Sequence, residues 1–489
     1  MNYRFLFLEF YIFTGKTYIL IPLPMENKRR KFLTSVSMLA ASAAFPLSAF
    51  SFGKPVKLKV ALVGTGIRGI TFWGQRLVQE YADILEFVGL CDVNPGRLEY
   101  AKSFIGVSCP TFINFETMVA RTKPDLIIVT TKDTNHHEFI IKGLQMGHDV
   151  LTEKPLTTDE VKCQAILDAE RKSNKNLIVG FNYRWSPYAT KIKELLASKS
   201  IGKLTSVDFN WYLNTYHGAS YFRRWHGEMQ ESGSLWVHKA THHFDLLNWW
   251  INSEPSEVFA YGDLEFYGKN GPFKGKNCRS CDFKTECDFY FDITKDERLM
   301  KLYVDHEKHD GYIRDNCLFR DNIDIYDKMS AQVKYKNKVQ LNYSLTTYSP
   351  IEGWRVAFNG TEGRIEAWLD IPYIKNAQID QAELHTREMD QSESDAFTTD
   401  PIIVHKLWND FETVNVTTEK AGHGGGDQRL QDHIFKKTQE KDPFGRAAGS
   451  RDGAMSCLIG IAARKSISSG QAVKIADLTD LVPKAEREG

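Results

Sequence analysis

Two short stretches of the chain carry side chains that can move protons. One is EKP, in which Lys154 follows Glu153 and precedes Pro155. The other is VHKATHHFD, residues 237–245, with two adjacent histidines, a lysine and a threonine. A lysine is normally protonated because its pKa is about 10.4, but a dry pocket lowers that value and makes the side chain a general base. The two stretches therefore predict an acid–base site, provided that the fold brings them together.

The second stretch opens a predicted helix, so its polar residues have alternative explanations. Phe244 and Leu247 mark a buried apolar side, and the polar residues gather at the N-terminal end. His238 and His242 are spaced i, i+4 and would project from one face as metal ligands do, although no third ligand stands at a diagnostic spacing nearby. Histidines that are merely satisfied at a helix end are the other interpretation.

A glycine-rich turn precedes both stretches. The run LKVALVGTGIRG begins with a buried-strand pattern over residues 58–63, and a helix is predicted over 70–81. Between them Gly64, Gly66 and Gly69 stand in G-x-G-x-x-G spacing. The first glycine allows the tight turn, the second lets the backbone approach a pyrophosphate, and the third lets the helix pack against its strand. This arrangement predicts a dinucleotide-binding site.

Asp92 ends the next predicted strand, residues 85–91, where a carboxylate accepts hydrogen bonds from adenosine ribose hydroxyls. Because that carboxylate repels a 2′-phosphate, the sequence favours NAD over NADP. Asp92 can also serve as the N-cap of the helix through Arg97, and the two roles can coexist.

Further strands and helices alternate through the first half of the chain, which is typical of a parallel sheet with helices on both faces. Strands are predicted over 125–130 and 149–152, with a helix over 136–146 between them. Lys154 then stands at the carboxyl end of a parallel strand, at the crevice where such folds bind ligands. Pro155 favours a cis peptide bond that turns the lysine inward.

Five motifs in this order, VALVGTGIRG, CDVNPGR, TKDTNHHE, GHDVLTEKPL and VGFNYRWSP, resemble the Gfo/Idh/MocA family of NAD(P)-dependent oxidoreductases over roughly residues 57–368. The resemblance implies that Lys154 is the catalytic base and that Glu153 lies beside the nicotinamide. Lys132 departs from the family, which commonly has proline there, so the conformation of that loop stays open. The expected cofactor-binding residues are Gly64, Gly66, Ile67, Arg68, Asp92, Arg97, Thr130, His136, Glu153, Lys154 and Asn182.

The same family commonly carries D-x-G-x-H followed three residues later by aspartate, which here is Asp245. His242 then takes the place of the histidine that holds the reacting hydroxyl, whereas His238 replaces the aspartate and Ala240 the glycine. The missing carboxylate predicts a variant site. The expected catalytic residues are Lys154 and His242, and the expected substrate-binding residues are Arg184, Tyr216, Trp225, His238, Lys239, Thr241 and His242.

Aromatic and hydrogen-bonding side chains also gather upstream, in NTYHGASYFRRWHGEMQESGS, residues 214–234. A pyranose needs both kinds, because its C–H face stacks on an aromatic ring while its hydroxyls take hydrogen bonds. The stretch therefore favours a carbohydrate or cyclitol substrate. A packed loop with solvated arginines is the alternative.

The second half changes to long strands with helices between them. Strands are predicted over 206–213, 257–264, 331–348 and 354–368, hairpin turns at 336–338 and 360–363, and helices over 186–197 and 238–250. The expected fold is α/β, with a Rossmann domain over residues 54–180 and an α+β domain over 181–489. The open, mainly antiparallel sheet of the second domain has helices on one face and can mediate homo-oligomerisation.

Two later segments are less regular. Residues 419–435 bring His423 and a glycine run before a helix that can close over the substrate pocket. A flexible lead-in to that helix is the alternative. Residues 381–400 are acidic and contain serine, and a loop is predicted there.

Four of the eight cysteines form a cluster, namely Cys278, Cys281, Cys287 and Cys317. C-x2-C-x5-C with a later cysteine can surround one structural zinc ion. Two disulfides are the alternative interpretation, because disulfides form in the oxidising compartments outside the cytoplasm. Because a four-thiolate site is closed, the insertion near residues 278–317 is expected to serve structure rather than catalysis.

The chain has 489 residues, zero formal net charge and no long basic run, which argues against nucleic acid as a partner.

Residues 1–53 are expected to be an upstream extension and export signal, with translation starting at Met25. Arg29 and Arg30, in RRKFL, resemble a twin-arginine signal, and the apolar stretch 32–45 is too short to span a bilayer. An ordinary secretory signal is the alternative. Both signals lead out of the cytoplasm, in bacteria to the periplasm.

The expected function is hydride transfer between NAD and a secondary hydroxyl or ketone of a sugar, glycoside or cyclitol. One alternative is a redox-neutral glycosidase, in which transient oxidation at C3 allows the glycosidic group to be eliminated. A second alternative is a non-catalytic sugar-binding protein. The intact set of Gly64, Asp92, Lys154 and His242 argues against that last possibility.

Overall fold

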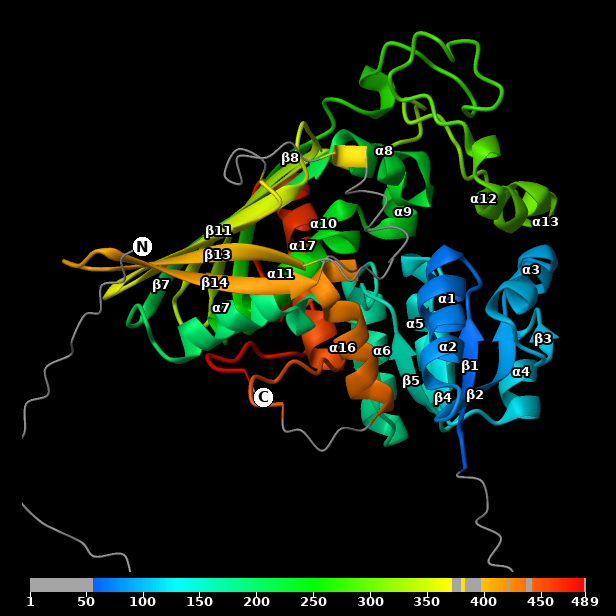
Figure 1. The fold of residues 1–489 in the computed structure, drawn as a ribbon, viewed down its shortest axis with the longest axis horizontal. Coiled ribbons are helices and arrows are strands. Elements are labelled where there is room, and N and C mark those ends of the chain that lie inside the picture. The colour runs from blue at the N-terminus through cyan, green and yellow to red at the C-terminus, as the bar shows by residue number, and fades with distance from the viewer. Residues whose placement is uncertain (1–55, 372–379, 383–396, 420–421, 437–441, 488–489) are drawn as a thin grey trace, which may run out of the picture. The chain divides into compact units, whose positions relative to one another are not determined.

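Two β-sheets organise the chain, a parallel sheet of six strands and a mixed sheet of nine (Figure 1). The computed structural model describes residues 56–371, 380–382, 397–419, 422–436 and 442–487. The predicted export signal and the start at Met25 lie outside the described residues.

The parallel sheet has the strand order β3-β2-β1-β4-β5-β6, which is the Rossmann order. Its strands are β1 (Leu58–Val63), β2 (Leu85–Cys91), β3 (Thr111–Phe112), β4 (Leu126–Val129), β5 (Asp149–Thr152) and β6 (Leu177–Val179). Helices cover both faces, so most strand residues are buried and apolar. One apolar cluster holds α1 (Ile67–Ile70), α2 (Arg76–Tyr81) and α3 (Pro95–Ile105), and the other holds α4 (Phe115–Thr122), α5 (His136–Gln145) and α6 (Glu160–Ser173). The predicted Rossmann fold is confirmed.

The second sheet has the order β14-β13-β12-β11-β7-β10-β9-β8-β15, and only β10 and β7 pair in parallel. The strands are β7 (Leu204–Asn214), β8 (Pro255–Asp263), β9 (Lys328–Tyr335), β10 (Gln340–Ser349), β11 (Gly353–Gly360), β12 (Gly363–Leu369), β13 (Phe397–Lys406), β14 (Phe411–Glu419) and β15 (Val473–Lys474). Buried residues alternate with exposed ones along β9 and β10, because only one face packs on helices. The mainly antiparallel sheet is therefore confirmed.

Helices α7 (Pro187–Ala197), α11 (Ala240–Ile251) and α17 (Ser450–Ser469) pack on the buried side of this sheet (Figure 1). The predicted helix over 238–250 is in fact two helices, α10 (Leu235–His238) and α11, which meet at Lys239. The loop predicted over 381–400 is wrong at its end, because residues 397–400 belong to β13 and pair with β14. Within that stretch, residues 383–396 lie outside the described residues.

The cysteine-containing insertion separates β8 from β9 and folds back onto the Rossmann half. It contains α12 (Glu297–Leu302) and α13 (Glu307–Asp310), and Figure 1 shows both beside α3. Gly96 of α3 makes this approach possible, since a Cβ there would lie 2.1 Å from Nδ1 of His306. Asn94 Nδ2 donates a hydrogen bond to the His306 carbonyl oxygen at 3.0 Å.

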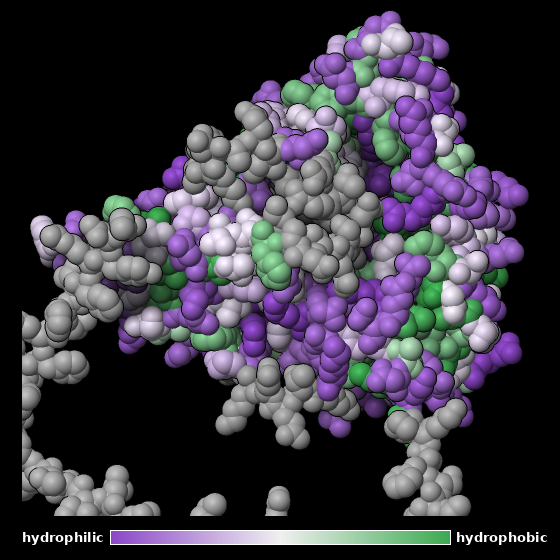
Figure 2. All heavy atoms as spheres, viewed as in Figure 1, coloured by the Kyte–Doolittle hydropathy of each residue, from purple (hydrophilic) through white to green (hydrophobic). Residues whose placement is uncertain are grey.

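No helix in the described part of the chain is long and apolar enough to cross a membrane. Hydrophilic residues predominate among the coloured atoms of Figure 2, with hydrophobic residues in smaller groups between them. On the sheet face turned away from the helices, exposed positions of β9 and β10 carry Ser330, Gln332, Lys334, Gln340 and Asn342. Homo-oligomerisation through this sheet stays a prediction.

Candidate active site

A cleft of about 1000 Å³ brings the two proton-moving stretches together. Its walls come from the glycine-rich turn, the end of β5, the start of α11 and the insertion. Every residue predicted to bind the cofactor lines it, and so do Trp225, His238, Lys239 and His242. The cleft is large enough for a dinucleotide and a small second ligand.

The three glycines of the turn have the local geometry that their predicted roles require. Gly64 has φ +91°, and a Cβ there would lie 2.6 Å from the Thr130 carbonyl oxygen. A Cβ on Gly69 would lie 2.2 Å from the Gly64 carbonyl oxygen, so the glycine lets the helix pack against the turn. A Cβ on Gly66 would meet only the Tyr303 hydroxyl, at 3.5 Å, which leaves the backbone accessible from the cleft. These features fit a bound dinucleotide.

Tyr303, from the insertion, contacts this turn and was not among the residues predicted from the sequence. Its hydroxyl accepts a hydrogen bond from the backbone N–H of Ile67 at 2.9 Å. That N–H opens the helix after the glycine turn, where dinucleotide-binding folds hold a pyrophosphate. The hydroxyl can still donate its own proton to an oxyanion. The insertion, expected to be purely structural, thus supplies a side chain to the cofactor end of the cleft.

Asp92 is held by the turn and by Arg97. Its Oδ2 accepts from the Thr65 backbone N–H at 2.8 Å, and its Oδ1 accepts from Arg97 Nη2 at 3.0 Å. Arg97 also pairs with Asp310 of the insertion at 2.6 Å, so two carboxylates offset its charge. The alternative role of Asp92 as an N-cap is wrong, because the Asn94 side chain caps α3 by accepting from the Arg97 backbone N–H.

The residues of EKP are fixed by hydrogen bonds. Glu153 Oε1 accepts from Arg68 Nε at 2.6 Å and from Trp73 Nε1 at 2.8 Å. The Lys154–Pro155 peptide bond is cis, as predicted. His136 braces the segment, because its Nδ1 lies 2.8 Å from the Pro155 carbonyl oxygen.

Lys154 lies inside the cleft, and its Nζ donates to the His238 carbonyl oxygen at 3.2 Å. Burial lowers the pKa of Lys154, and this effect outweighs the opposite influence of Tyr221, Asp133 and Glu153. A neutral amine at this place can accept a proton. The structure thus provides the environment that a lysine base requires.

His238, which replaces the aspartate of the family motif, forms a pair with Asp133. Its Nδ1 lies 2.6 Å from Asp133 Oδ2. Burial raises the pKa of Asp133, and burial together with the charge of Lys154 lowers the pKa of His238. The hydrogen bond requires a proton on one of the two groups, so the pair carries an exchangeable proton next to Lys154.

His242 faces the same cleft with free hydrogen-bonding capacity. It is 6% exposed, and its buried Nδ1 has no hydrogen-bond partner among the described residues. Burial and the charge of Lys154 lower its pKa well below 6.5, so the imidazole is neutral at physiological pH. The ring of Tyr183 packs edge-on at 4.8 Å and fixes its orientation. His242 can therefore bind a substrate hydroxyl.

The C-terminal segment reaches the cleft as its sequence suggested. His423 lies in the cleft wall, and its ring is 6.0 Å from that of His242. Asp427, in α16 (Gly426–Phe435), accepts from Asn182 Nδ2 at 2.6 Å and lies 3.0 Å from His423 Nδ1. Asn182 thereby joins the end of the Rossmann half to this segment.

A second chain of polar side chains enters the cleft from α8 (Thr215–Arg223), and its residues are not among the expected site residues. The Tyr221 hydroxyl lies 3.1 Å from His217 Nε2, and His217 Nδ1 lies 3.0 Å from Glu352 Oε1. Burial raises the pKa of Tyr221, but the charges of Lys239, His217 and Lys154 outweigh it and lower the net value. Tyr221 lines the cleft and can exchange a proton there.

Three predicted substrate-binding residues lie elsewhere. Arg184 is fully buried and binds Asp245 through two hydrogen bonds, the longer of 2.7 Å, so it is part of a structural ion pair. Tyr216 is 54% exposed and outside the cleft wall, because α8 turns it away while presenting Tyr221. Thr241 is fully buried behind the cleft wall.

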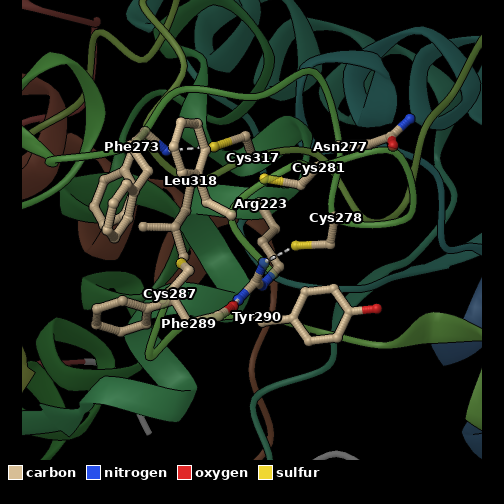
Figure 3. Close-up of a pocket in the computed structure, with 12 residues that line it drawn as sticks. Arg223, Phe273, Asn277, Cys278, Cys281, Cys287, Phe289, Tyr290, Cys317 and Leu318 are labelled. Atoms are coloured by element: carbon tan, nitrogen blue, oxygen red, sulfur yellow. Dashed lines mark hydrogen bonds between the residues drawn. The ribbon is translucent and has the colours of Figure 1, made fainter. Parts of the chain in front are cut away.

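The structure brings the four clustered cysteines together but joins none of them in a disulfide. The four sulfurs line one small cavity, but all four cysteines are free thiols, and no three potential ligands in the described ranges are placed to hold a metal ion. Figure 3 shows the Arg223 guanidinium among them, with Nη1 donating to Cys278 Sγ at 3.0 Å. The described residues thus show neither a disulfide nor a group of metal ligands there, and the structural zinc site stays a prediction. His238 and His242 also belong to no group of three potential metal ligands in the described ranges.

Comparisons with known proteins agree with this geometry. Residues 58–181 match the model "Oxidoreductase family, NAD-binding Rossmann fold", and residues 193–475 match "Oxidoreductase family, C-terminal alpha/beta domain". The Bacillus subtilis (strain 168) protein YteT is 35% identical over 439 residues, which cover 86% of this chain and 98% of YteT.

More distant proteins match as well. An inositol 2-dehydrogenase/D-chiro-inositol 3-dehydrogenase of Lactiplantibacillus plantarum (strain ATCC BAA-793 / NCIMB 8826 / WCFS1) is 25% identical over 41% of this chain and 54% of its own. The structure of a levoglucosan dehydrogenase in complex with NADH and levoglucosan has a TM-score of 0.59 at 16% identity, covering 86% of this chain and 100% of that one. The chain belongs to the Gfo/Idh/MocA family of NAD(P)-binding oxidoreductases.

Proposed function

We propose that this protein transfers a hydride between NAD and a secondary hydroxyl or ketone of a sugar, glycoside or cyclitol. The observation that carries the proposal is the shared cleft, in which Lys154, with a lowered pKa, lies together with His242 and the glycine-rich turn. Nδ1 of His242 has no hydrogen-bond partner among the described residues. Related enzymes act on inositols and levoglucosan, and those names support a polyhydroxylated substrate.

The residues divide the chemistry between them. Lys154 accepts the proton of the substrate hydroxyl, and His242 holds the oxygen on which negative charge develops. Glu153 fixes Arg68 at the cofactor end, while Asp92 and the turn hold the adenosine half. NAD, when bound, accepts the hydride from the carbinol carbon and can return it. Asp92 favours NAD over NADP, since the charge of Arg97 is already offset by two carboxylates.

A redox-neutral glycosidase is the second candidate, and the extra proton-carrying groups favour it. Oxidation at C3 acidifies the C2 hydrogen, a base removes that proton, the aglycone leaves protonated, and water then adds before C3 is reduced. Besides Lys154, this series of reaction steps needs further acids and bases. The pair of His238 with Asp133 and the chain from Tyr221 to Glu352 supply them. Tyr216 does not supply one of these groups, because it is exposed and lies outside the cleft wall.

One experiment separates the two reactions. The full chain is incubated with NAD and a panel of free hexoses, inositols and aryl glycosides, while the reduced-nicotinamide absorbance and aryl release are both recorded. Net NAD reduction with a free sugar establishes the dehydrogenase. Aryl release without net reduction establishes the glycosidase, and neither signal with any compound would refute both.

Export to the periplasm stays a proposal, for which a fractionation experiment is the test.

A further inference from the structure

Two arginines, Arg224 and Arg314, stand in the cleft wall and form no ion pair with a carboxylate among the described residues, although Arg224 is close enough to Asp133 to lower the pKa of that carboxyl. By contrast, each carboxylate that lines the cleft has a cationic or imidazole side chain within 3.6 Å. Arg314 is 6% exposed and lies over the Tyr303 ring, at 5.9 Å, with no hydrogen bond or ion pair in the described chain. Arg224 donates from Nε to the Ser220 carbonyl oxygen and lies over the Tyr221 ring.

Keeping these two guanidinium groups together is unfavourable without a counter-charge. Burial lowers the pKa of Arg224 to about 10, and the charge of Arg314 is the next largest cause. A buried cation that lacks an anionic partner costs free energy, because it loses its hydration without gaining charge-assisted hydrogen bonds. The pair is therefore prepared for an oxyanion that comes from outside the chain.

The position of the pair points to the substrate. Arg224 is close enough to His238, His226 and Tyr221 to lower the pKa of each. These side chains form the catalytic end of the cleft, next to Lys154. A guanidinium holds a carboxylate or phosphate through two parallel hydrogen bonds, so two of them fix its position and orientation.

We infer that Arg224 and Arg314 bind an oxyanion on the substrate, so that the preferred substrate is an acidic sugar rather than a neutral one. The inference rests on the proposed function and narrows it. The oxyanion is either the carboxylate of a uronic acid or the phosphate of a sugar phosphate. The pyrophosphate of the cofactor is the competing ligand, because Tyr303 connects Arg314 to the glycine-rich turn.

The test is calorimetric binding to the full chain saturated with NAD. The probes are D-glucuronate and D-galacturonate, the neutral sugars D-glucose and D-galactose, and the two hexose 6-phosphates. We expect at least one anionic member to bind about tenfold or more tightly than its neutral counterpart. Arg314→Gln should remove that preference and leave the affinity for neutral sugars and for NAD unchanged. Arg171→Gln, on the surface, is the matched control.

The outcomes are distinct. Equal binding of acidic and neutral sugars overturns the inference, and so does an Arg314→Gln variant that weakens NAD while keeping the preference. If Arg314→Gln does not fold, Arg224→Gln and the salt dependence of wild-type binding decide, since only an anionic ligand should weaken steeply with ionic strength. A uronate that binds through Arg314 without ever reducing NAD would refute the proposed function and leave this inference intact.

Discussion

Replacing single glycines in the turn separates its folding role from its binding role. In Gly69→Ala, the new methyl group would lie 2.2 Å from the Gly64 carbonyl oxygen and 2.7 Å from Thr130 Oγ1. Those two atoms are already hydrogen-bonded to each other at 2.6 Å, so neither can yield alone. The helix that contains residue 69 must therefore move away from the turn by about 1 Å. Overpacking of this kind lowers the free energy of unfolding by about 1–3 kcal/mol.

Gly66→Ala is the matched comparison, because its methyl group meets nothing closer than the Tyr303 hydroxyl at 3.5 Å. It should leave stability unchanged but occupy the space through which a pyrophosphate approaches the backbone. Urea unfolding and calorimetric NAD titration measure the two effects. We expect Gly69→Ala to lower the unfolding midpoint, and Gly66→Ala to keep it while raising the Kd for NAD about tenfold or more. Equal unfolding midpoints for the two variants would refute the reasoning.

Three further predictions concern charged groups. Asp245→Ala strips the buried Arg184 of its main partner and should cost about 3–5 kcal/mol in thermal or urea unfolding; a wild-type midpoint would contradict this. Asp92→Ser should weaken NAD and raise the ratio of NADP to NAD affinity, because it removes one of the two carboxylates that offset Arg97; the two Kd values decide. The pH profile of kcat/KM should rise as Lys154 loses its proton, with a midpoint below pH 10.5, since the pKa of this lysine is lowered from 10.5; a flat profile would show that no lysine titrates in the reaction.

The sequence predicts those parts of the site that depend on local spacing. Glycine spacing identifies the turn, and hydrophobic runs place Asp92 and Lys154 after strands β2 and β5. These features need only the chain on either side of each residue. The resemblance to a known family then assigns roles to the residues, and the cleft contains all of its cofactor set.

Contacts between segments that are distant in the chain could not be predicted from the sequence. Tyr303 reaches a backbone N–H 236 residues away, and no local pattern marks it. Arg184 looked available because its partner, Asp245, lies 61 residues on. Tyr216 and Tyr221 both lie in the aromatic stretch 214–234, and only the folded helix α8 shows that Tyr221 faces the cleft and Tyr216 does not.

The most direct test of the central claim is hydride transfer by Lys154→Met, which keeps an unbranched side chain, one atom shorter, and removes its base. The full-length variant and the wild type are loaded with NAD, and single-turnover reduction is followed with the sugar that the wild type oxidises fastest. The account predicts wild-type unfolding and, at saturating NAD, a rate about 10²- to 10⁴-fold lower. A variant that reduces NAD at close to the wild-type rate would contradict the account.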